Sequence, residues 1–269
     1  MMSRRLNLAF FRASSLSTSM ILAFVLLCSV TVLAEESGES KSRKVIEAAI
    51  EAMGGDAYRK VNSTHSYGRY FRFRKGQKRF SRYNDWTVFK PVKWRFQQGK
   101  GKNQFVMIYN LEEGKGWTLE GKETIEEIPE DSIEQFRRSV KEELDMILRY
   151  RLDEEGMNFY YYGPDDIAGQ GKYEAVEFLD LTNKSVVVFF DRQSHLPAKV
   201  ETHSTDQVGV RHKEELELSN WHLIEGINTP LRFDSYVDGE VSWQRFVEGI
   251  TFDPEVPPGY FLEPVIEKK

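Results

Sequence analysis

The side chains that could catalyse a reaction or bind a metal are scattered along this chain of 269 residues. No His-Glu-x-x-His pattern occurs, and the histidines show no spacing typical of zinc ligands. These histidines are His65, His195, His203, His212 and His222. No Gly-x-Ser-x-Gly motif marks a nucleophile, and Ser63, Ser66 and Ser81 lie in strand-like stretches. The sequence therefore predicts no enzyme, no metal and no cofactor.

Two acidic groups and one glycine pair are candidate ligand sites. The groups 153–155 and 165–166 are acidic enough for calcium but lack the alternating spacing of a calcium-binding loop. Both adjoin glycines, so solvated turns explain them. Gly169 and Gly171 precede no helical pattern, which a phosphate-binding loop requires. We interpret all three segments as loops.

Aromatic residues offer the one chemistry that is abundant, which is binding of apolar surface. The chain contains 18 Phe, 12 Tyr and 5 Trp, and many of them recur at every second position. Such spacing places rings on one face of a strand. Composition alone leaves two interpretations open, a cavity lined by these rings and a solid core filled by them.

The N-terminal residues 1–34 are typical of a secretory signal peptide. Arg4, Arg5 and Arg12 precede an apolar run at about 20–33, with no acidic residue among them. An uncleaved anchor is the alternative, but the run is short for a bilayer of about 30 Å. Cys28 lies in this run, so cleavage after Ala34 leaves a chain without cysteine. This predicts export to the periplasm, with a flexible polar leader at 35–43 and a single domain at 44–269.

The charge balance argues against nucleic acid as a partner. The whole chain has a net charge of −5, and the signal peptide takes away three arginines and no acidic residue. Basic residues are dense between Arg69 and Lys102, whereas 112–155 is acidic. This predicts either a polarised electric field or ordinary solvated strand faces.

The elements that position the aromatics are one short helix and a series of strands. Val45, Ile46, Ala49, Ile50 and Met53 follow a helical period that ends at a pair of glycines. From residue 64 to 128 the apolar residues alternate between hairpin turns, and alternation returns between 158 and 252. A mainly β fold of about ten or eleven antiparallel strands is expected.

A second helix is predicted at 131–152. Its apolar stripe runs from Ile133 to Leu148 opposite charged residues. A sheet of this width must curl because strand twist accumulates, and its apolar face must be covered. We expect an incomplete β-barrel whose concave face is covered by this longer helix.

The order of these elements resembles the bacterial outer-membrane lipoprotein-sorting family. The resemblance covers nearly the whole chain after the signal peptide. Its cues are the helix ending at Gly54 and Gly55, the turn at 191–197, the strand pair around 226–230 and the tail at 252–264. All are turn and edge residues, so they support the fold more than an activity.

The resemblance implies a non-catalytic periplasmic carrier that holds lipid or lipoprotein acyl chains, with the helix as a lid. The implied lining residues are Phe71, Phe73, Trp94, Phe96, Phe105, Met107 and Tyr109 from the sheet, and Phe136, Val140, Leu144 and Ile147 from the lid. No motif here marks the arginine that such carriers use to hold the lid. The alternative is an envelope interaction or sensor module that binds a membrane or membrane-protein partner.

Overall fold

The computed structural model describes residues 37–265, apart from 75, 122–123, 166–170 and 207. The predicted signal peptide therefore lies outside the described residues. Helices open the described chain and return after the sixth strand. They are α2 (Gly38–Met53), α3 (Asp56–Lys60), α4 (Glu130–Val140) and α5 (Leu144–Met146), with the 3₁₀ turn η1 (Gly101–Asn103) and the π-helical turn η2 (Ile147–Arg151).

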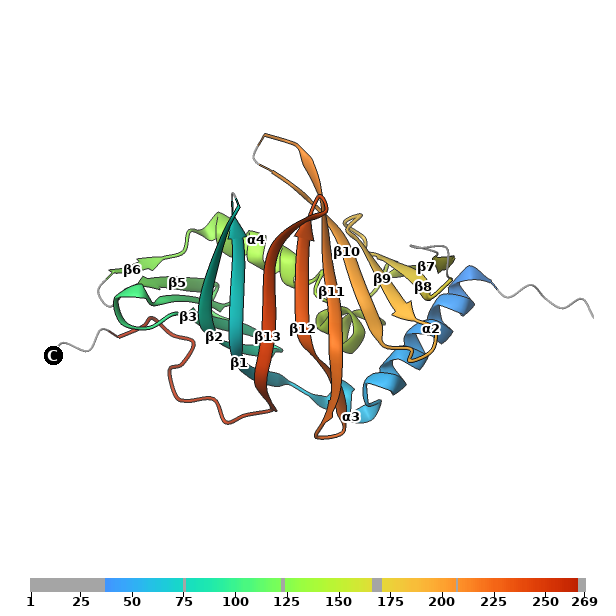
Figure 1. The fold of residues 1–269 in the computed structure, drawn as a ribbon, viewed down its shortest axis with the longest axis horizontal. Coiled ribbons are helices and arrows are strands. Elements are labelled where there is room, and N and C mark those ends of the chain that lie inside the picture. The colour runs from blue at the N-terminus through green and yellow to red at the C-terminus, as the bar shows by residue number, and fades with distance from the viewer. Residues whose placement is uncertain (1–36, 75, 122–123, 166–170, 207, 266–269) are drawn as a thin grey trace, which may run out of the picture. The chain divides into compact units, whose positions relative to one another are not determined.

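The strands of the described residues form one antiparallel sheet (Figure 1). They are β1 (Ser63–Arg74), β2 (Gln77–Phe89), β3 (Val92–Gln98), β4 (Phe105–Asn110), β5 (Lys115–Glu120), β6 (Thr124–Glu127), β7 (Asn158–Asp165), β8 (Tyr173–Leu179), β9 (Ser185–Asp191), β10 (Pro197–Thr205), β11 (Arg211–Ile224), β12 (Ile227–Val237) and β13 (Glu240–Phe252). Their order is β6-β5-β4-β3-β2-β1-β13-β12-β11-β10-β9-β8-β7. The sheet is not closed, because β6 and β7 are its two edges.

The predicted mainly β architecture is confirmed, although the sheet has 13 strands instead of ten or eleven. The additional strands come from the stretch 64–128, where short strands follow one another through tight turns. In contrast, the predicted strands 208–218 and 221–225 are one strand, β11. Asn220 lies within it with a positive φ of 56°, so the alternation changes phase there while the strand continues.

Helix α2 begins earlier than the sequence predicted. Ser37 caps it by accepting a hydrogen bond from the Ser40 amide at 3.2 Å, and Glu39 pairs with Arg43 one turn on. These contacts make residues 38–43 helical, which corrects the prediction of a flexible leader there. The helix ends as expected at Gly54, whose φ is 127° and where a Cβ would approach the Gly226 carbonyl oxygen to 2.6 Å.

The predicted single helix at 131–152 is wrong. Helix α4 stops at Val140, a turn with Glu143 in an extended conformation follows, and the chain then forms α5 and η2. The apolar stripe is continuous in sequence, but its two halves pack against different partners. Because of this turn, Phe136 in the first half packs against β3 and β4. Ile147 and Leu148 in the second half pack against α2. The longest helix described is consequently α2, with 16 residues.

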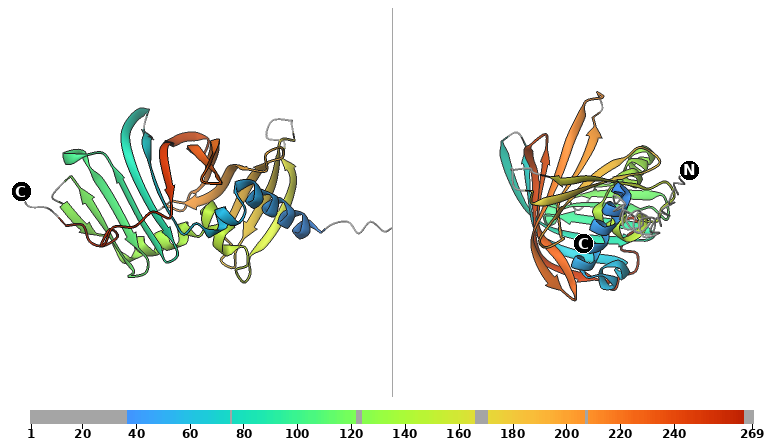
Figure 2. Two further views of the ribbon diagram at one scale, coloured as in Figure 1. Left: turned by 90° about the horizontal axis from the view of Figure 1, so that it is seen from below. Right: turned by 90° about the vertical axis from the view of Figure 1, so that its right-hand side faces the viewer.

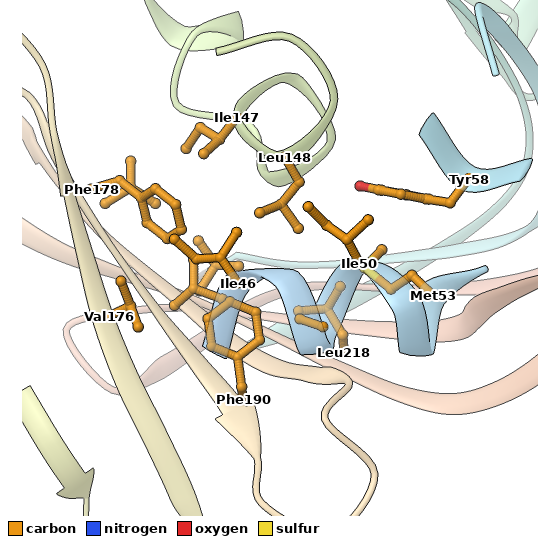
Figure 3. Packing of buried hydrophobic residues seen from close by; sticks show 14 of the residues in the cluster. Ile46, Ile50, Met53, Tyr58, Ile147, Leu148, Val176, Phe178, Phe190 and Leu218 are labelled. Carbon is orange, nitrogen blue, oxygen red and sulfur yellow. The ribbon is translucent and has the colours of Figure 1, made fainter. Parts of the chain in front are cut away.

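Helix α2 and η2 build the main hydrophobic core with strands β7–β12 (Figure 3). Ile46 and Ile50 point from α2 toward Ile147 and Leu148 of η2, all at 3% exposure or less. Phe178 and Phe190 complete the core from the sheet. Figure 2 shows α2 lying along the β7 end of the sheet. We call this cluster the α2 core.

A second cluster lies under the C-terminal tail, residues 253–265. The tail covers the face of β4 and β5 that carries Val106, Ile108 and Trp117. Phe261 packs there against Val106, Ile108 and Trp117. Arg95 of β3 donates a hydrogen bond to the Tyr260 carbonyl at 3.0 Å and places its guanidinium over the Tyr260 ring. Strand β4 is therefore apolar on both faces. In the described part of the chain, no helix is long and apolar enough to cross a membrane.

Candidate functional site

Six aromatic side chains form a continuous wall on the face of β1–β4 and β13 that α4 partly covers. Phe96 is at its centre, with Trp94 stacked at 5.7 Å, Tyr83 stacked at 6.0 Å and Tyr70 edge-on at 5.8 Å between ring centroids. Register explains the arrangement, because alternate residues of paired strands share a face. We call this set the aromatic wall, and its members are Tyr70, Tyr83, Trp94, Phe96, Tyr109 and Trp243.

Helix α4 covers one end of the aromatic wall with a single ring. Phe136 stacks on Tyr109 at 3.9 Å and an interplanar angle of 11°, and lies 5.7 Å from Trp94. Ile133 and Val140 are also buried, at 4% and 5% exposure. Among the described residues, no hydrogen bond or ion pair joins α4 to the sheet. The cover is held by apolar contact alone.

A polar pair lies in the middle of this aromatic surface. Arg245 of β13 donates to Asp85 of β2 at 2.8 Å, and the Trp94 indole donates to the same carboxylate at 2.9 Å. The Arg245 guanidinium also lies over the rings of Tyr83 and Phe96, 4.9 and 5.6 Å from their centroids. The pair links β2 and β13 across β1. It neutralises two charges that would otherwise be unfavourable beside so much apolar surface.

The pKa of Glu143, in the turn after α4, is shifted toward neutral pH. Burial raises its pKa to about 7, the negative charges of Asp85 and Asp145 act in the same direction, and Arg245 opposes them. Glu143 as a whole residue is exposed, and it lines a recess under α4 together with Phe136 and Met146. Burial also raises the pKa of Tyr70 and Tyr109 on the wall.

One recess between α4 and the sheet has a volume of about 10 Å³, which is about the volume that one water molecule needs. Sites for drug-sized ligands typically have about 300 Å³ or more. The pocket is lined by Thr87, Val88, Phe89, Val92, Trp94, Phe136, Val140, Glu143 and Met146. An acyl chain would therefore require α4 to move.

The structure brings only part of the predicted lining set together. Trp94, Phe96 and Tyr109 belong to the aromatic wall, and Phe136 and Val140 cover it. Register places Phe105 and Met107 on the same face of β4 as Tyr109, further along the strand. The remaining four predicted residues, which lie elsewhere, are Phe71, Phe73, Leu144 and Ile147.

Phe71 and Phe73 lie on the opposite face of β1, because Phe71 pairs with Phe80 and packs on Phe246. Alternation in β1 was recognised correctly, but alternation does not say which face is covered. Leu144 and Ile147 pack with the α2 core instead, since the turn at 141–143 redirects the chain. The structure does not join these four residues to the aromatic wall.

Sequence reasoning missed six residues of the site, which are Tyr70, Tyr83, Asp85, Glu143, Trp243 and Arg245. Tyr70 alternates with Phe71 and Phe73, whose face of β1 was chosen instead, and Tyr83 lies between polar residues of β2. Trp243 lies far away in the chain and reaches the wall only because β13 pairs with β1. Nothing in the sequence indicates that Asp85 and Arg245 form a pair, because 159 residues lie between them. A carboxylate inside an otherwise aromatic strand, as in Asp85-Trp86, is the one local signal available.

The described residues contain no group of three or more His, Asp or Glu side chains placed to hold a metal ion. His212 pairs with Asp238 at 2.7 Å and with Asp206 at 3.5 Å, at the end of β11. His65 stacks on Trp86 with 4.2 Å between ring centroids. These contacts are local to turns and strand faces.

The fold is shared with solved structures of very different sequence. A DUF1329 family protein from Desulfovibrio piger ATCC 29098 has a TM-score of 0.57 at 13% identity, over 82% of this chain and 96% of that chain. A putative outer membrane lipoprotein-sorting protein domain from Vibrio parahaemolyticus has a TM-score of 0.53 at 12% identity, over 82% and 97%. No protein-family model and no curated protein matches the sequence.

These comparisons define a class at the level of the fold. This chain, an open antiparallel sheet with an N-terminal helix and helices inserted between β6 and β7, shares its fold with the putative lipoprotein-sorting protein domain. The resemblance drawn from turn and edge residues is therefore confirmed for the fold. Identity near 12% shows the fold alone.

Proposed function

We propose that this protein is a non-catalytic periplasmic binding protein that shields acyl chains of a lipid or lipoprotein against the aromatic wall. The observation that carries the proposal is the way α4 is attached. It covers aromatic rings and is joined to the sheet, within the described residues, by apolar contacts only. An acyl chain offers the wall the same kind of contact and can lie between the wall and Phe136, which then closes over it.

The energetics of such an exchange are favourable. Each methylene removed from water contributes about 0.8 kcal/mol and each buried Val, Ile or Phe side chain about 1.5–3 kcal/mol, so roughly six to eleven methylene groups match the three apolar side chains of α4. The chain beyond the turn is anchored: Tyr58 donates to Asp145 at 2.8 Å, and Arg151 pairs with Asp180 at 3.0 Å.

The turn 141–143 is held as well, because Glu142 pairs with Lys184 at 3.2 Å and Arg151 donates to the Lys141 carbonyl. Movement is therefore confined to α4 itself, while the turn and η2 stay with the α2 core.

Native mass spectrometry of residues 35–269, purified from the periplasm and followed by solvent extraction, tests the proposal. Near-stoichiometric phospholipid or acylated protein supports it and identifies the cargo. The variant Phe136→Ser should retain at least fivefold less ligand, because it removes the ring that closes the wall. Leu223→Ser is the matched control, since Leu223 is 69% exposed on β11. Equal retention by both variants would count against α4 as the lid.

An envelope interaction module is the second candidate, and one observation favours it. The recess under α4 has a volume of about 10 Å³, which fits the filled interior that this alternative predicts. A mass that remains free of ligand after incubation with phospholipid and with acylated peptide would favour it over the carrier.

A further inference from the structure

The tip of the β1–β2 hairpin concentrates positive charge in a protein that is acidic as a whole. Residues 69–82 contain seven basic residues and no acidic one, although the chain has a net charge of −5. They are Arg69, Arg72, Arg74, Lys75, Lys78, Arg79 and Arg82. We call residues 69–82 the basic hairpin. A concentration of this kind indicates an anionic partner.

Among the described residues, the tip of the basic hairpin has no strand partner on either side. Strand β13 pairs with β1 only as far as Arg72, and β3 pairs with β2 only from Tyr83 onward. Between these points β1 and β2 pair only with each other, from the Phe73–Lys78 pair to the Arg74–Gln77 pair. Figure 1 shows this end of β1 and β2 at the upper edge of the sheet. Both edges of the tip are therefore unpaired, and the described residues Arg74 and 76–80 are exposed.

One face of the tip is a pocket of about 300 Å³ lined by Arg72, Arg74, Gln77 and Arg79. All four side chains are exposed. Arg72 and Arg79 are direct cross-strand partners, an arrangement of like charges that weakens a hairpin. No carboxylate of the described residues lies within ion-pair distance of these three arginines. Their charge is left for an external anion.

The other face of the tip is aromatic. Phe80 is 58% exposed and lies 5.3 Å from Phe71, which packs edge-on against Phe246 at 5.6 Å. The Lys78 ammonium lies 4.4 Å from the Phe71 ring centroid. Arg69 and Arg82 differ from the pocket arginines, because both pair with Glu248. The tip therefore carries an exposed ring on one face and unneutralised arginines on the other, and these are the two kinds of group that a membrane interface attracts.

We propose that the basic hairpin docks on the surface of a membrane that contains anionic phospholipid. The pocket arginines bind headgroup phosphates, since a guanidinium matches the geometry of phosphate oxygens. Phe80 enters the boundary between headgroups and acyl chains, where aromatic rings are favoured. Arg72, Arg74, Arg79 and Phe80 are not members of the aromatic wall, and the inference holds whether or not the wall binds an acyl chain.

Co-sedimentation with vesicles tests the proposal. Residues 35–269 should sediment with vesicles of phosphatidylcholine and phosphatidylglycerol, and not with phosphatidylcholine alone. Each arginine near an anionic surface is worth roughly a fivefold change in partition. The variant Arg72→Gln/Arg74→Gln/Arg79→Gln should therefore bind roughly a hundredfold more weakly. Phe80→Ser should weaken binding severalfold and leave its salt dependence unchanged.

The matched control removes three exposed basic residues elsewhere, as Arg59→Gln/Lys115→Gln/Arg211→Gln. It should keep most of the binding, and all variants should share the thermal transition of the wild type. Equal sedimentation with both kinds of vesicle, or equal loss in both triple variants, overturns the proposal. So does tight binding of an acidic peptide without binding to vesicles. Retention of acyl ligand is measured on the same hairpin variant. If it loses membrane binding but keeps its acyl ligand, the membrane surface and the carrier function are tested separately.

Discussion

The two helical covers of this sheet are attached in different ways. Helix α2 and η2 bury large aliphatic and aromatic residues against β7–β12, and polar contacts add to this packing: Arg151 pairs with Asp180 at 3.0 Å and Asn228 donates to the Ala52 carbonyl at 2.7 Å. Helix α4 buries Ile133 and Val140 and half-buries Phe136 against the other half of the sheet, and it makes no polar contact with the sheet among the described residues. The first cover stabilises the fold, and the second is the one that we propose moves to admit an acyl chain.

The largest expected contrast is between two identical substitutions, one under each cover. Ile50→Ala, in the α2 core at 1% exposure, should lower the free energy of unfolding by about 3 kcal/mol, because it leaves a cavity that cannot collapse. Ile133→Ala, in α4 at 4% exposure, should cost less than half of that. Helix α4 can detach locally, which limits the cost to the free energy of that opening.

Urea unfolding measured by circular dichroism gives both values. Equal losses for the two variants would mean that α4 is as firmly part of the fold as α2, and would remove the basis for a moving lid.

The next contrast is between two arginines. Arg151→Leu should cost about 3 kcal/mol, because the Asp180 carboxylate stays behind without its buried partner. The two side chains are 7% and 10% exposed. Arg137→Leu, which removes an exposed pair with Glu134 in α4, should cost about 0.5 kcal/mol or less. Thermal unfolding of both variants beside the wild type checks the order.

Acid unfolding sharpens this second contrast. Burial alone would raise the pKa of Asp180, but hydrogen bonds from Thr182, Lys184 and Arg151 lower it to about 2. A lowered pKa stabilises the fold above the ordinary value of 3.8, and this stabilisation is lost as the pH falls through about 2. Arg151→Leu should lose part of this acid dependence, and Arg137→Leu should keep it.

The smallest expected effect concerns Glu143, beside Asp85, Asp145 and Arg245. Its pKa is raised from 4.5 to about 7, so the folded protein holds a proton that the unfolded chain releases. The resulting stabilisation is complete below pH 4.5 and lost as the pH rises through about 7. Glu143→Gln should therefore flatten the decline in urea midpoint between about pH 5 and about pH 8.

The control for this measurement is Glu134→Gln, which removes a carboxylate from the exposed side of α4. It should show the pH dependence of the wild type. A decline that persists unchanged in Glu143→Gln would place the responsible group elsewhere.

Much of the fold followed from local pattern. The helical period at 45–53 and the paired glycines after it predicted the body and the end of α2, because both depend on residues within one or two turns. The same holds for the turn at 191–197, where Asp191 accepts hydrogen bonds from the amides of Gln193 and Ser194. The prediction of one continuous helix at 131–152 was wrong. The apolar stripe fits a single helix, and only its two packing partners require the turn at 141–143.

The candidate site was less predictable, for a related physical reason. Trp94, Phe96, Tyr109 and Phe136 were found because each lies in a strongly patterned element. Phe71 and Phe73 were placed on the wrong face, since a period of two is symmetric between faces. Which face of β1 is covered depends on α4 and on the C-terminal tail, both of which are distant in sequence.

The sequence by itself determined the antiparallel sheet, the N-terminal helix with its glycine stop and the charge of the basic hairpin, because each depends on neighbours along the chain. Only the tertiary structure decided the rest. The pairing of β1 with β13 brings Arg245 to Asp85 and Trp243 to Tyr70, and it isolates the tip of the hairpin. Strand pairing between the two ends of the chain is not encoded in local periodicity, and the site is built on that pairing.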